Sequence, residues 1–169
     1  ENMQITIHAD NAEVNRALAG LSARLRNLRP VMKEIGEIVR TSVERNFAAG
    51  GRPKWDESAR VKREGGQTLS LTGSLRRSFA RHDAVQAGND RVAVGTNVDY
   101  AAIHQLGGKT GPRVIKPKKA KALFWPGARR PVKSVNHPGS VIPPRPFLMV
   151  QNEDWTEIKN VINRYLSMR

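Results

Sequence analysis

The sequence predicts an α+β domain: a small antiparallel sheet packed by a long N-terminal helix and a C-terminal helix, with a long basic extended arm. Three observations lead to this fold class. Apolar residues recur at helical spacing over residues 10–47 and 152–166, two short alternating segments lie between them within 79–96, and six of the ten prolines fall in 109–143. We expect residues 3–169, starting at Met3, to form a single domain into which 109–143 is inserted as an extended arm or hairpin.

The N-terminal part is predicted to form a strand followed by a long helix. Gln4–His8 alternates apolar and polar residues, and Asp10 opens the helix with Glu13 as its capping-box partner. Pro30 either kinks this helix or starts a second one at its first turn, and the helix ends near Phe47, before a Gly-Gly pair. The apolar stripe comprises Val14, Leu18, Leu21, Leu25 and Leu28 before the proline and Val31, Ile35, Ile38, Val39 and Val43 after it.

The middle of the chain is predicted to contain a hairpin. A loop over Gly51–Leu69 precedes a short element that begins at Leu71–Leu75 and has the length of one helical turn. Strands are then predicted over Phe79–Ala87 and Arg91–Thr96. The linking residues Gly88-Asn89-Asp90 tolerate positive φ, which favours a tight antiparallel turn.

Two further helices are expected near the C-terminal end. Asp99 is predicted to cap a short helix over Tyr100–Leu106. The closing helix is predicted to start with Asn152 as its cap, with Glu153 and Asp154 favourably placed at its positive end. Its predicted buried face comprises Trp155, Ile158, Ile162, Tyr165 and Leu166.

The positive charge of the chain is concentrated in one block. The sequence holds 29 basic and 15 acidic residues, and residues 100–152 hold ten basic residues and no acidic one. We interpret 109–143 as a long arm, an extended hairpin with Leu123–Trp125 and Pro131–Val135 as its legs. Such a block indicates contact with nucleic acid or with an acidic partner surface, although a solvated loop that keeps the protein soluble is the alternative.

The residues that carry most enzyme chemistry are missing or badly spaced. The absence of cysteine excludes disulfides and thiolate chemistry. Gly108-Lys109-Thr110 resembles the end of a phosphate-binding loop, but Ile103 stands where that motif needs glycine. Asp99 and His104 are about one helical turn apart, yet a helix cap and an interfacial or core histidine explain them better than an acid–base pair. We therefore expect no enzyme activity, no cofactor and no metal site.

The sequence also lacks membrane signals. No apolar run approaches the roughly 18–20 residues that span a bilayer. The N-terminal residues have neither the basic nor the apolar region of a signal peptide. The expectation is a soluble protein of the cytoplasm that does not contact membranes.

Several short segments occur in the order found in a known family. They include Asn46-Phe47, Gly51–Trp55 and Leu71–Ser78, and later Val94–Gly108 and Pro143–Leu148 ahead of a terminal helix. The ordered set resembles the phage virion morphogenesis (tail completion) family over roughly residues 31–166, and the segment 94–108 is the most specific part.

This resemblance implies a structural role. A member would complete the tail of a tailed bacteriophage or join head and tail at the neck, through contacts in a ring of copies around the DNA channel. Its partners would be other tail or neck proteins, it would reside in the virion and in the host cytoplasm during assembly, and it would need no cofactor. Whether the isolated protein is a monomer or an oligomer stays open.

The residues offer candidate contacts for that role. A helix as short as 100–106 is unstable alone, so it must pack on its own sheet or on a neighbouring subunit. Arg145 lies between prolines and is held in place, which suits an interface anchor. The candidate subunit interface comprises Tyr100, Ile103, His104, Arg145 and Phe147. The candidate DNA-channel-facing basic residues are Lys116, Lys118, Lys119, Lys121, Arg129 and Arg130, of which the lysines alternate with other residues as on one face of a strand.

A non-sequence-specific nucleic-acid-binding protein that uses the basic arm is the competing hypothesis. It explains the arm but not the near balance of charge in the rest of the chain, and aromatic residues are too sparse for a stacking platform. DNA affinity of an isolated monomer that falls steeply with salt would favour it.

Overall fold

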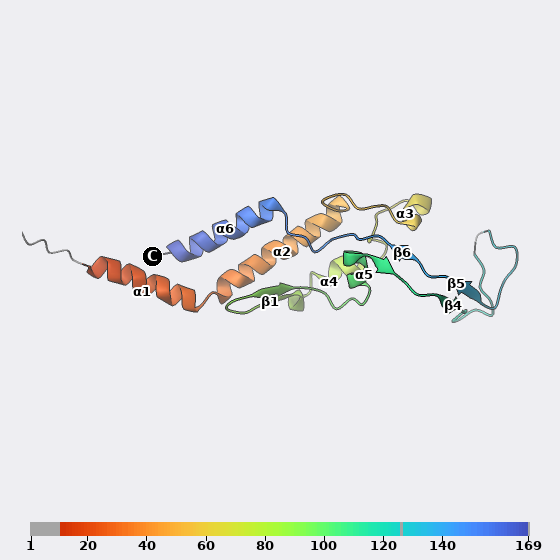
Figure 1. Ribbon diagram of the computed structural model, residues 1–169, viewed down its shortest axis with the longest axis horizontal. Coiled ribbons are helices and arrows are strands. Elements are labelled where there is room, and N and C mark those ends of the chain that lie inside the picture. Colours follow the sequence, from red (N-terminus) through yellow and green to blue (C-terminus); the bar gives the residue numbers. More distant parts are fainter. Residues whose placement is uncertain (1–10, 126, 169) are drawn as a thin grey trace, which may run out of the picture.

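Two antiparallel helices form the spine of the molecule. In the computed structural model, which describes residues 11–125 and 127–168, α2 (Arg29–Ala49) packs along α6 (Asn152–Ser167) (Figure 1). The molecule is elongated, with α1 (Ala12–Arg26) towards one end and the arm at the other. The predicted strand Gln4–His8 and the predicted cap Asp10 lie outside the described residues.

The long N-terminal helix is split, the second of the two outcomes expected at Pro30. Proline has no N–H to donate, so it is tolerated in the first turn of α2, where that N–H would lack an intrahelical partner. Gly50 ends α2 with a positive φ of 70°. The apolar stripe of α2 faces the core, whereas Val14 and Leu18 on α1 are 56% and 58% exposed.

The predicted hairpin is confirmed and packs against α2. β1 (Val85–Ala87) pairs with β2 (Val92–Val94) in antiparallel register, with Val85 opposite Val94. The two strands approach α2 closely at Gly36, where an added Cβ would lie 2.3 Å from a γ-methyl of Val85. The absence of a side chain at Gly36 therefore lets the helix and the hairpin come together.

The first strand of this hairpin is shorter than predicted. Phe79 is the C-cap of α4 (Ser74–Ser78), the helical turn expected in this region, and a 3₁₀ turn over His82–Ala84 separates it from β1. Both Phe79 and Ala84 are buried. They point into the core from a tight turn, which the apolar pattern did not distinguish from a strand.

Two predictions on either side of the hairpin need correction: that 51–69 is a loop throughout, and that Asp99 caps the short helix. The loop over Gly51–Leu69 contains a helix, α3 (Ala59–Glu64), whose first turn is capped by the Ser58 hydroxyl accepting from the Val61 N–H. Asp99 does not cap α5 (Ala101–Leu106), because the chain enters that helix through Tyr100.

The start of α6 also differs from the prediction. Gln151, not Asn152, is the cap: its side chain and that of Asp154 form a reciprocal capping box. Trp155 is 52% exposed, so its predicted place on the buried face is wrong, and Ile158 and Val161 fill that face.

An aromatic cluster forms the core beside the end of α2. The ring of Phe47 stacks on Phe147 with centroids 5.5 Å apart, and meets the Trp55 ring edge-on at 5.5 Å. Phe79 lies 5.8 Å from Phe147. These rings come from four distant parts of the sequence, so their packing ties α2, the following loop, α4 and the end of the arm together.

The arm is an extended antiparallel hairpin. Two ladders support it: β3 (Gly108–Lys109) pairs with β6 (Val141–Ile142), and further out β4 (Arg113–Ile115) pairs with β5 (Val135–His137). Beyond them, Leu123 and Val132 form an isolated antiparallel bridge. Of the predicted legs 123–125 and 131–135, only Leu123 and Val132 pair with each other, whereas Val135 pairs with Ile115 in β4. Most of the pairing in the arm therefore lies closer to the body.

Candidate assembly surface

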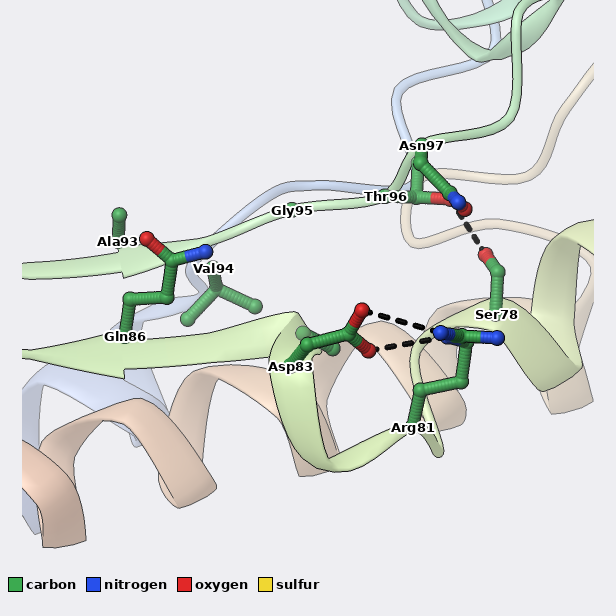
Figure 2. A pocket seen from close by; sticks show the side chains of 10 residues that line it. Ser78, Arg81, Asp83, Gln86, Ala93, Val94, Gly95, Thr96 and Asn97 are labelled. Atoms are coloured by element: carbon green, nitrogen blue, oxygen red, sulfur yellow. Dashed lines mark hydrogen bonds and ion pairs between the residues drawn. The ribbon is translucent and has the colours of Figure 1, made fainter.

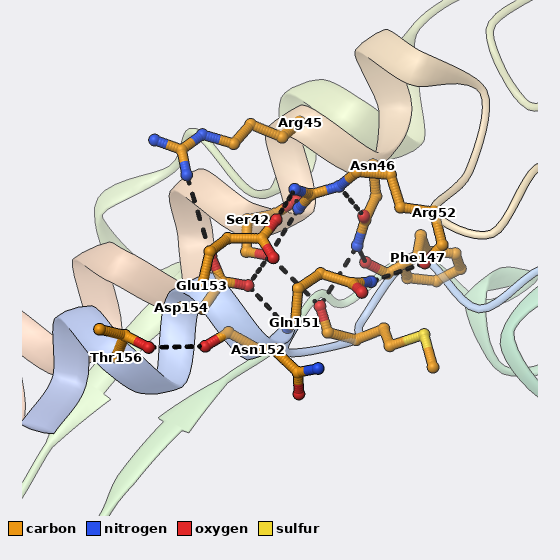
Figure 3. Close-up of polar contacts among 11 residues, drawn as sticks. Ser42, Arg45, Asn46, Arg52, Phe147, Gln151, Asn152, Glu153, Asp154 and Thr156 are labelled. Carbon is orange, nitrogen blue, oxygen red and sulfur yellow. Dashed lines mark hydrogen bonds and ion pairs between the residues drawn. The ribbon is translucent and has the colours of Figure 1, made fainter.

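A polar network at the start of α6 joins α2 to the root of the arm, where the segment 143–151 returns to the body (Figure 3). The Arg52 guanidinium donates through Nε to Oδ1 of Asn46 at 2.8 Å and through Nη2 to the Ser42 hydroxyl at 2.9 Å. Its Nη1 also donates to Glu153 at 2.6 Å. Arg52, from the Gly-Arg-Pro segment, thus connects α2 with the first turn of α6.

The same network holds the returning chain of the arm. Asn46 donates from Nδ2 to the backbone carbonyl of Phe147 at 2.8 Å. The fully buried carboxylate of Asp154 accepts from the Ser42 hydroxyl and, at 2.8 Å, from the Gln151 N–H. Because buried polar groups are costly unless paired, these bonds favour one position of the segment after the arm.

Gln105 holds the same segment from the other side. Its Oε1 accepts from the N–H groups of Phe147 at 3.0 Å and Leu148 at 2.9 Å, and its Nε2 donates to the Leu148 carbonyl at 3.0 Å. The N–H of Arg145 donates to the His104 carbonyl at 2.7 Å. Gln105 was not among the predicted site residues, although it stands in the most specific family-like segment, between Tyr100 and Gly108.

A pocket of about 290 Å³ lies between α4, α5 and the segment before α4. Its rim carries the apolar side chains of Leu71, which is 71% exposed, and Tyr100, which is 46% exposed. His104 and Arg145 also line the pocket. Residues of three family-like segments thus meet at one place.

Arg145 is an unusually enclosed cation. It is only 5% exposed, and its Nε donates to the backbone carbonyl of Asp56 at 3.0 Å. Within the described part of the chain, no carboxylate forms an ion pair with it. Burial lowers the pKa of Arg145, and the charge of Asp56 acts in the opposite direction.

His104 shares this environment. Burial lowers the pKa of its imidazole, and the positive charge of Arg145 lowers that pKa further. Its Nδ1 is buried and has no hydrogen-bond partner among the described residues. Burial and the neighbouring guanidinium both favour the neutral form of the imidazole.

The predicted interface residues separate into two groups. Tyr100 is exposed, and Ile103 and His104 are half-buried on α5, so these three lie at or near the surface. Phe147 is fully buried in the aromatic core and presents no surface to a partner, and Arg145 reaches the surface only through the pocket. The expected role of Phe147 in a subunit contact is replaced by a role in the core of its own chain.

The predicted basic residues of the arm are all exposed, but they do not share the face of a strand. The chain over 116–121 forms no strand, because β4 ends at Ile115 and Pro117 interrupts the pairing. The exposed set is Lys116, Lys118, Lys119, Lys121, Arg129 and Arg130.

The outer part of the arm also exposes large apolar side chains. Phe124 is 67% exposed and Trp125 is 46% exposed. Together with Ile115, Leu123 and Val135 they line a shallow apolar pocket of about 320 Å³. Exposed aromatic side chains, which are enriched in protein interfaces, therefore occur on the arm beside the basic residues.

A third pocket, of about 320 Å³, lies between the hairpin and the end of α4 (Figure 2). Arg81 forms a bidentate ion pair with Asp83 at 2.9 and 3.1 Å, and this bond is the main cause that lowers the pKa of Asp83. Ser78 donates to the Leu75 carbonyl at 2.6 Å and accepts from the Thr96 hydroxyl at 2.6 Å. These groups pair with one another, and none is arranged as an activated nucleophile.

Metal binding and membrane crossing find no support in the described ranges. No group of three or more His, Asp or Glu side chains there is placed to hold a metal ion. Nor does any helix in those ranges combine the length and apolar character needed to cross a bilayer.

Comparison with known proteins supports the family resemblance of the segments at the root of the arm. The sequence pattern of the phage virion morphogenesis family matches residues 9–167. This chain belongs to that family. The Mu-like prophage FluMu G protein 2 of Haemophilus influenzae is 31% identical over 165 residues, which covers 97% of each chain. No solved structure matches.

Family membership confirms the resemblance seen in the sequence and assigns the chain to the assembly of phage virions. It also gives the family-like segments a structural meaning. Asn46, Arg52 and Trp55 hold the segment that follows the arm, since Trp55 donates from Nε1 to the Pro146 carbonyl at 3.2 Å. Much of the family-like pattern therefore positions the arm and the α5 pocket.

Proposed function

We propose that this virion morphogenesis protein is a non-enzymatic structural component that completes the tail or joins head and tail at the neck. It would act as a ring of copies around the DNA channel, contact other tail or neck proteins, and reside in the virion and, during assembly, in the host cytoplasm. The observation that carries the proposal is the arm: a hairpin held at its root by hydrogen bonds of Asn46 and Gln105, whose outer part lies away from the body (Figure 1). Phe124 and Trp125 in the arm are exposed.

Such an arm suits contact with a neighbouring subunit. Its prolines restrict the chain before docking, so less conformational entropy is lost when it binds. The exposed Tyr100 and the half-buried Ile103 and His104, at and within α5, offer a second contact surface. In a ring, the basic residues of the arm would face the lumen and contact DNA phosphates without reading sequence.

Electron microscopy of particles from a phage that lacks this gene tests the proposal. We expect DNA-filled heads separated from tails, or tails of abnormal end structure, and we expect the wild-type gene supplied in trans to restore joined particles. Normal, infectious and fully joined particles would rule out the neck or tail-end role.

A nucleic-acid-binding role outside the particle is the second candidate, and a specific observation favours it: residues 109–143 carry nine basic residues and no acidic one. Replacing Lys116, Lys118, Lys119, Lys121, Arg129 and Arg130 by glutamine would then abolish most DNA affinity of the isolated protein. The slope of log affinity against log salt would also become shallower by about 0.9 for each phosphate that the variant no longer neutralises. Weak DNA binding that these substitutions do not alter, together with self-association, would favour the assembly role.

A further inference from the structure

We infer that the pocket beside α5 binds a carboxylate, carried by an acidic residue within an apolar peptide segment of a neighbouring virion protein, and that Arg145 is the cation that receives it. The proposed assembly role enters only in naming the partner as a virion protein. The binding chemistry itself follows from the buried guanidinium, the polar lining and the apolar rim.

The guanidinium of Arg145 has hydrogen-bonding capacity that its own chain leaves unused. An arginine offers five N–H donors, and the Nε donor of Arg145 is taken by the Asp56 carbonyl. Across the described ranges, Nη1 and Nη2 make no hydrogen bond and no ion pair, although the residue is only 5% exposed. The two Nη atoms are not among the buried atoms that lack a partner, so they reach solvent through the pocket, and the charge of Asp56 acts on the guanidinium without an ion pair. Their paired donors match the two oxygens of a carboxylate.

The lining of the pocket adds polar groups next to the guanidinium. The buried Nδ1 of His104 has no partner in the described part of the chain. The hydroxyls of Thr72 and Ser74 also line the pocket and lie 2.9 Å apart, so one donates to the other and the second keeps its proton for a ligand oxygen. A carboxylate at Arg145 would therefore find further donors beside it.

The rim favours a peptide over a nucleic-acid backbone. DNA phosphates are usually met by exposed lysine and arginine side chains, whereas here the cation lies at the bottom of a pocket whose rim carries Leu71 and Tyr100. The other arginine of the lining, Arg60, donates to the backbone carbonyls of Gly65 and Gln67 and is not free for a phosphate. An acidic side chain flanked by aliphatic residues fits both the charge and the rim.

Side-chain NMR of the ¹⁵N-labelled full chain, with three probes, tests the inference. The probes are the capped peptides acetyl-Leu-Glu-Leu-amide and acetyl-Leu-Gln-Leu-amide, and inorganic phosphate. The glutamate peptide is expected to shift the Arg145 Nε–H and His104 ring signals saturably, and to bind at least about tenfold more tightly than the glutamine peptide. Equal effects of the two peptides, or an effect of phosphate alone, would overturn it.

A matched pair of variants keeps the test independent of folding defects. Leu71 is 71% exposed, so both Leu71→Glu and Leu71→Gln should fold as the natural chain does. The glutamate variant places a competing carboxylate at the rim. It should therefore bind the glutamate peptide about tenfold more weakly than the glutamine variant does. Equal peptide affinity of the two variants would contradict the inference.

The two proposals fail separately. Phage lacking the gene should be rescued less well by Leu71→Glu than by Leu71→Gln if the pocket acts in assembly. Should the particles without the gene be normal while the peptides behave as expected, the assembly role falls and the carboxylate site stands. If the protein binds both peptides equally while particles without the gene are unjoined, the carboxylate site is ruled out and the assembly role is supported.

Discussion

The root and the outer part of the arm each carry a phenylalanine, in opposite surroundings. Phe147, where the arm rejoins the body, is fully buried and packs against Phe47 and Phe79. Phe124, far out on the arm, is 67% exposed and lines a shallow apolar pocket together with its neighbours. Residue type alone does not separate the two: burial makes one a part of the core and leaves the other free to contact a partner.

The difference extends to the polar groups around them. At the root, Asn46, Gln105 and Asp154 each make hydrogen bonds with groups far away in sequence, so this part is coupled to the stability of the body. Further out, the arm depends on short backbone ladders and on proline. We expect substitutions at the root to unfold the protein, and substitutions further out to affect assembly with little effect on stability.

The largest effect should come from Phe147→Ala. Removing a fully buried ring from contact with two others should lower the free energy of unfolding by about 3–5 kcal/mol. Denaturant unfolding followed by tryptophan fluorescence measures it, since Trp55 lies in the same cluster. A loss below about 1 kcal/mol would show that the aromatic cluster contributes little and that the root resembles the outer arm.

Asp154→Ala should have the next largest effect. It removes the acceptor for the Ser42 hydroxyl and the Gln151 N–H and ends the capping box of α6, so we expect a loss of about 2–3 kcal/mol. Glu157→Ala, an exposed position on the same helix, is the control and should stay within about 0.5 kcal/mol of the natural chain. Thermal unfolding of the two variants side by side decides the matter.

A pair of glycine substitutions sharpens the contrast within helices. Gly36→Ala should cost about 1–2 kcal/mol, because the new Cβ would lie 2.3 Å from a methyl of Val85 and force the hairpin away from α2. Gly20→Ala on α1 meets only the far end of the Arg24 side chain, 3.4 Å away, and should gain up to about 1 kcal/mol from helix propensity. Equal signs for the two changes in unfolding midpoint would contradict this account of helix–hairpin packing.

Phe124→Ala should have the smallest effect on stability, below about 0.5 kcal/mol, because the side chain is already largely in water. The same variant should fail to restore joined particles in a phage that lacks the gene. Complementation at the natural level would indicate that the exposed ring is not a contact. A stability loss as large as that of Phe147→Ala would remove the distinction between root and outer arm.

Sequence patterns predicted the helices and strands more accurately than they predicted which residues are buried or exposed. The periodic stripe around Pro30 predicted the helical region and left open whether the proline kinks or splits it, and residues 88–90, which tolerate positive φ, predicted the hairpin. Trp155 and Phe147 were assigned to the wrong environments, because an apolar residue near a helix start or after a proline can face either side. α3 was missed because one turn capped by Ser58 offers too short a pattern to detect.

The site residues show the same limit. Tyr100 and His104 were selected from one short helix, but Arg145 becomes their neighbour only because its backbone N–H bonds to the His104 carbonyl. Gln105 was overlooked since nothing in its local sequence indicates that its amide will hold residues 147 and 148. Contacts across about forty residues depend on how the chain returns from the arm.

The sequence by itself determined the α+β class, the helical segments, the single basic arm rich in proline, and membership of the virion morphogenesis family. These follow from periodicity, composition and the order of short segments, all of which are local or additive properties. Only the tertiary structure decided that Phe147 belongs to the core, that Trp125 stays exposed, and that Arg145 lies enclosed without a carboxylate partner in the described chain. Burial and charge pairing depend on residues brought together from distant positions, and one-dimensional patterns do not contain that information.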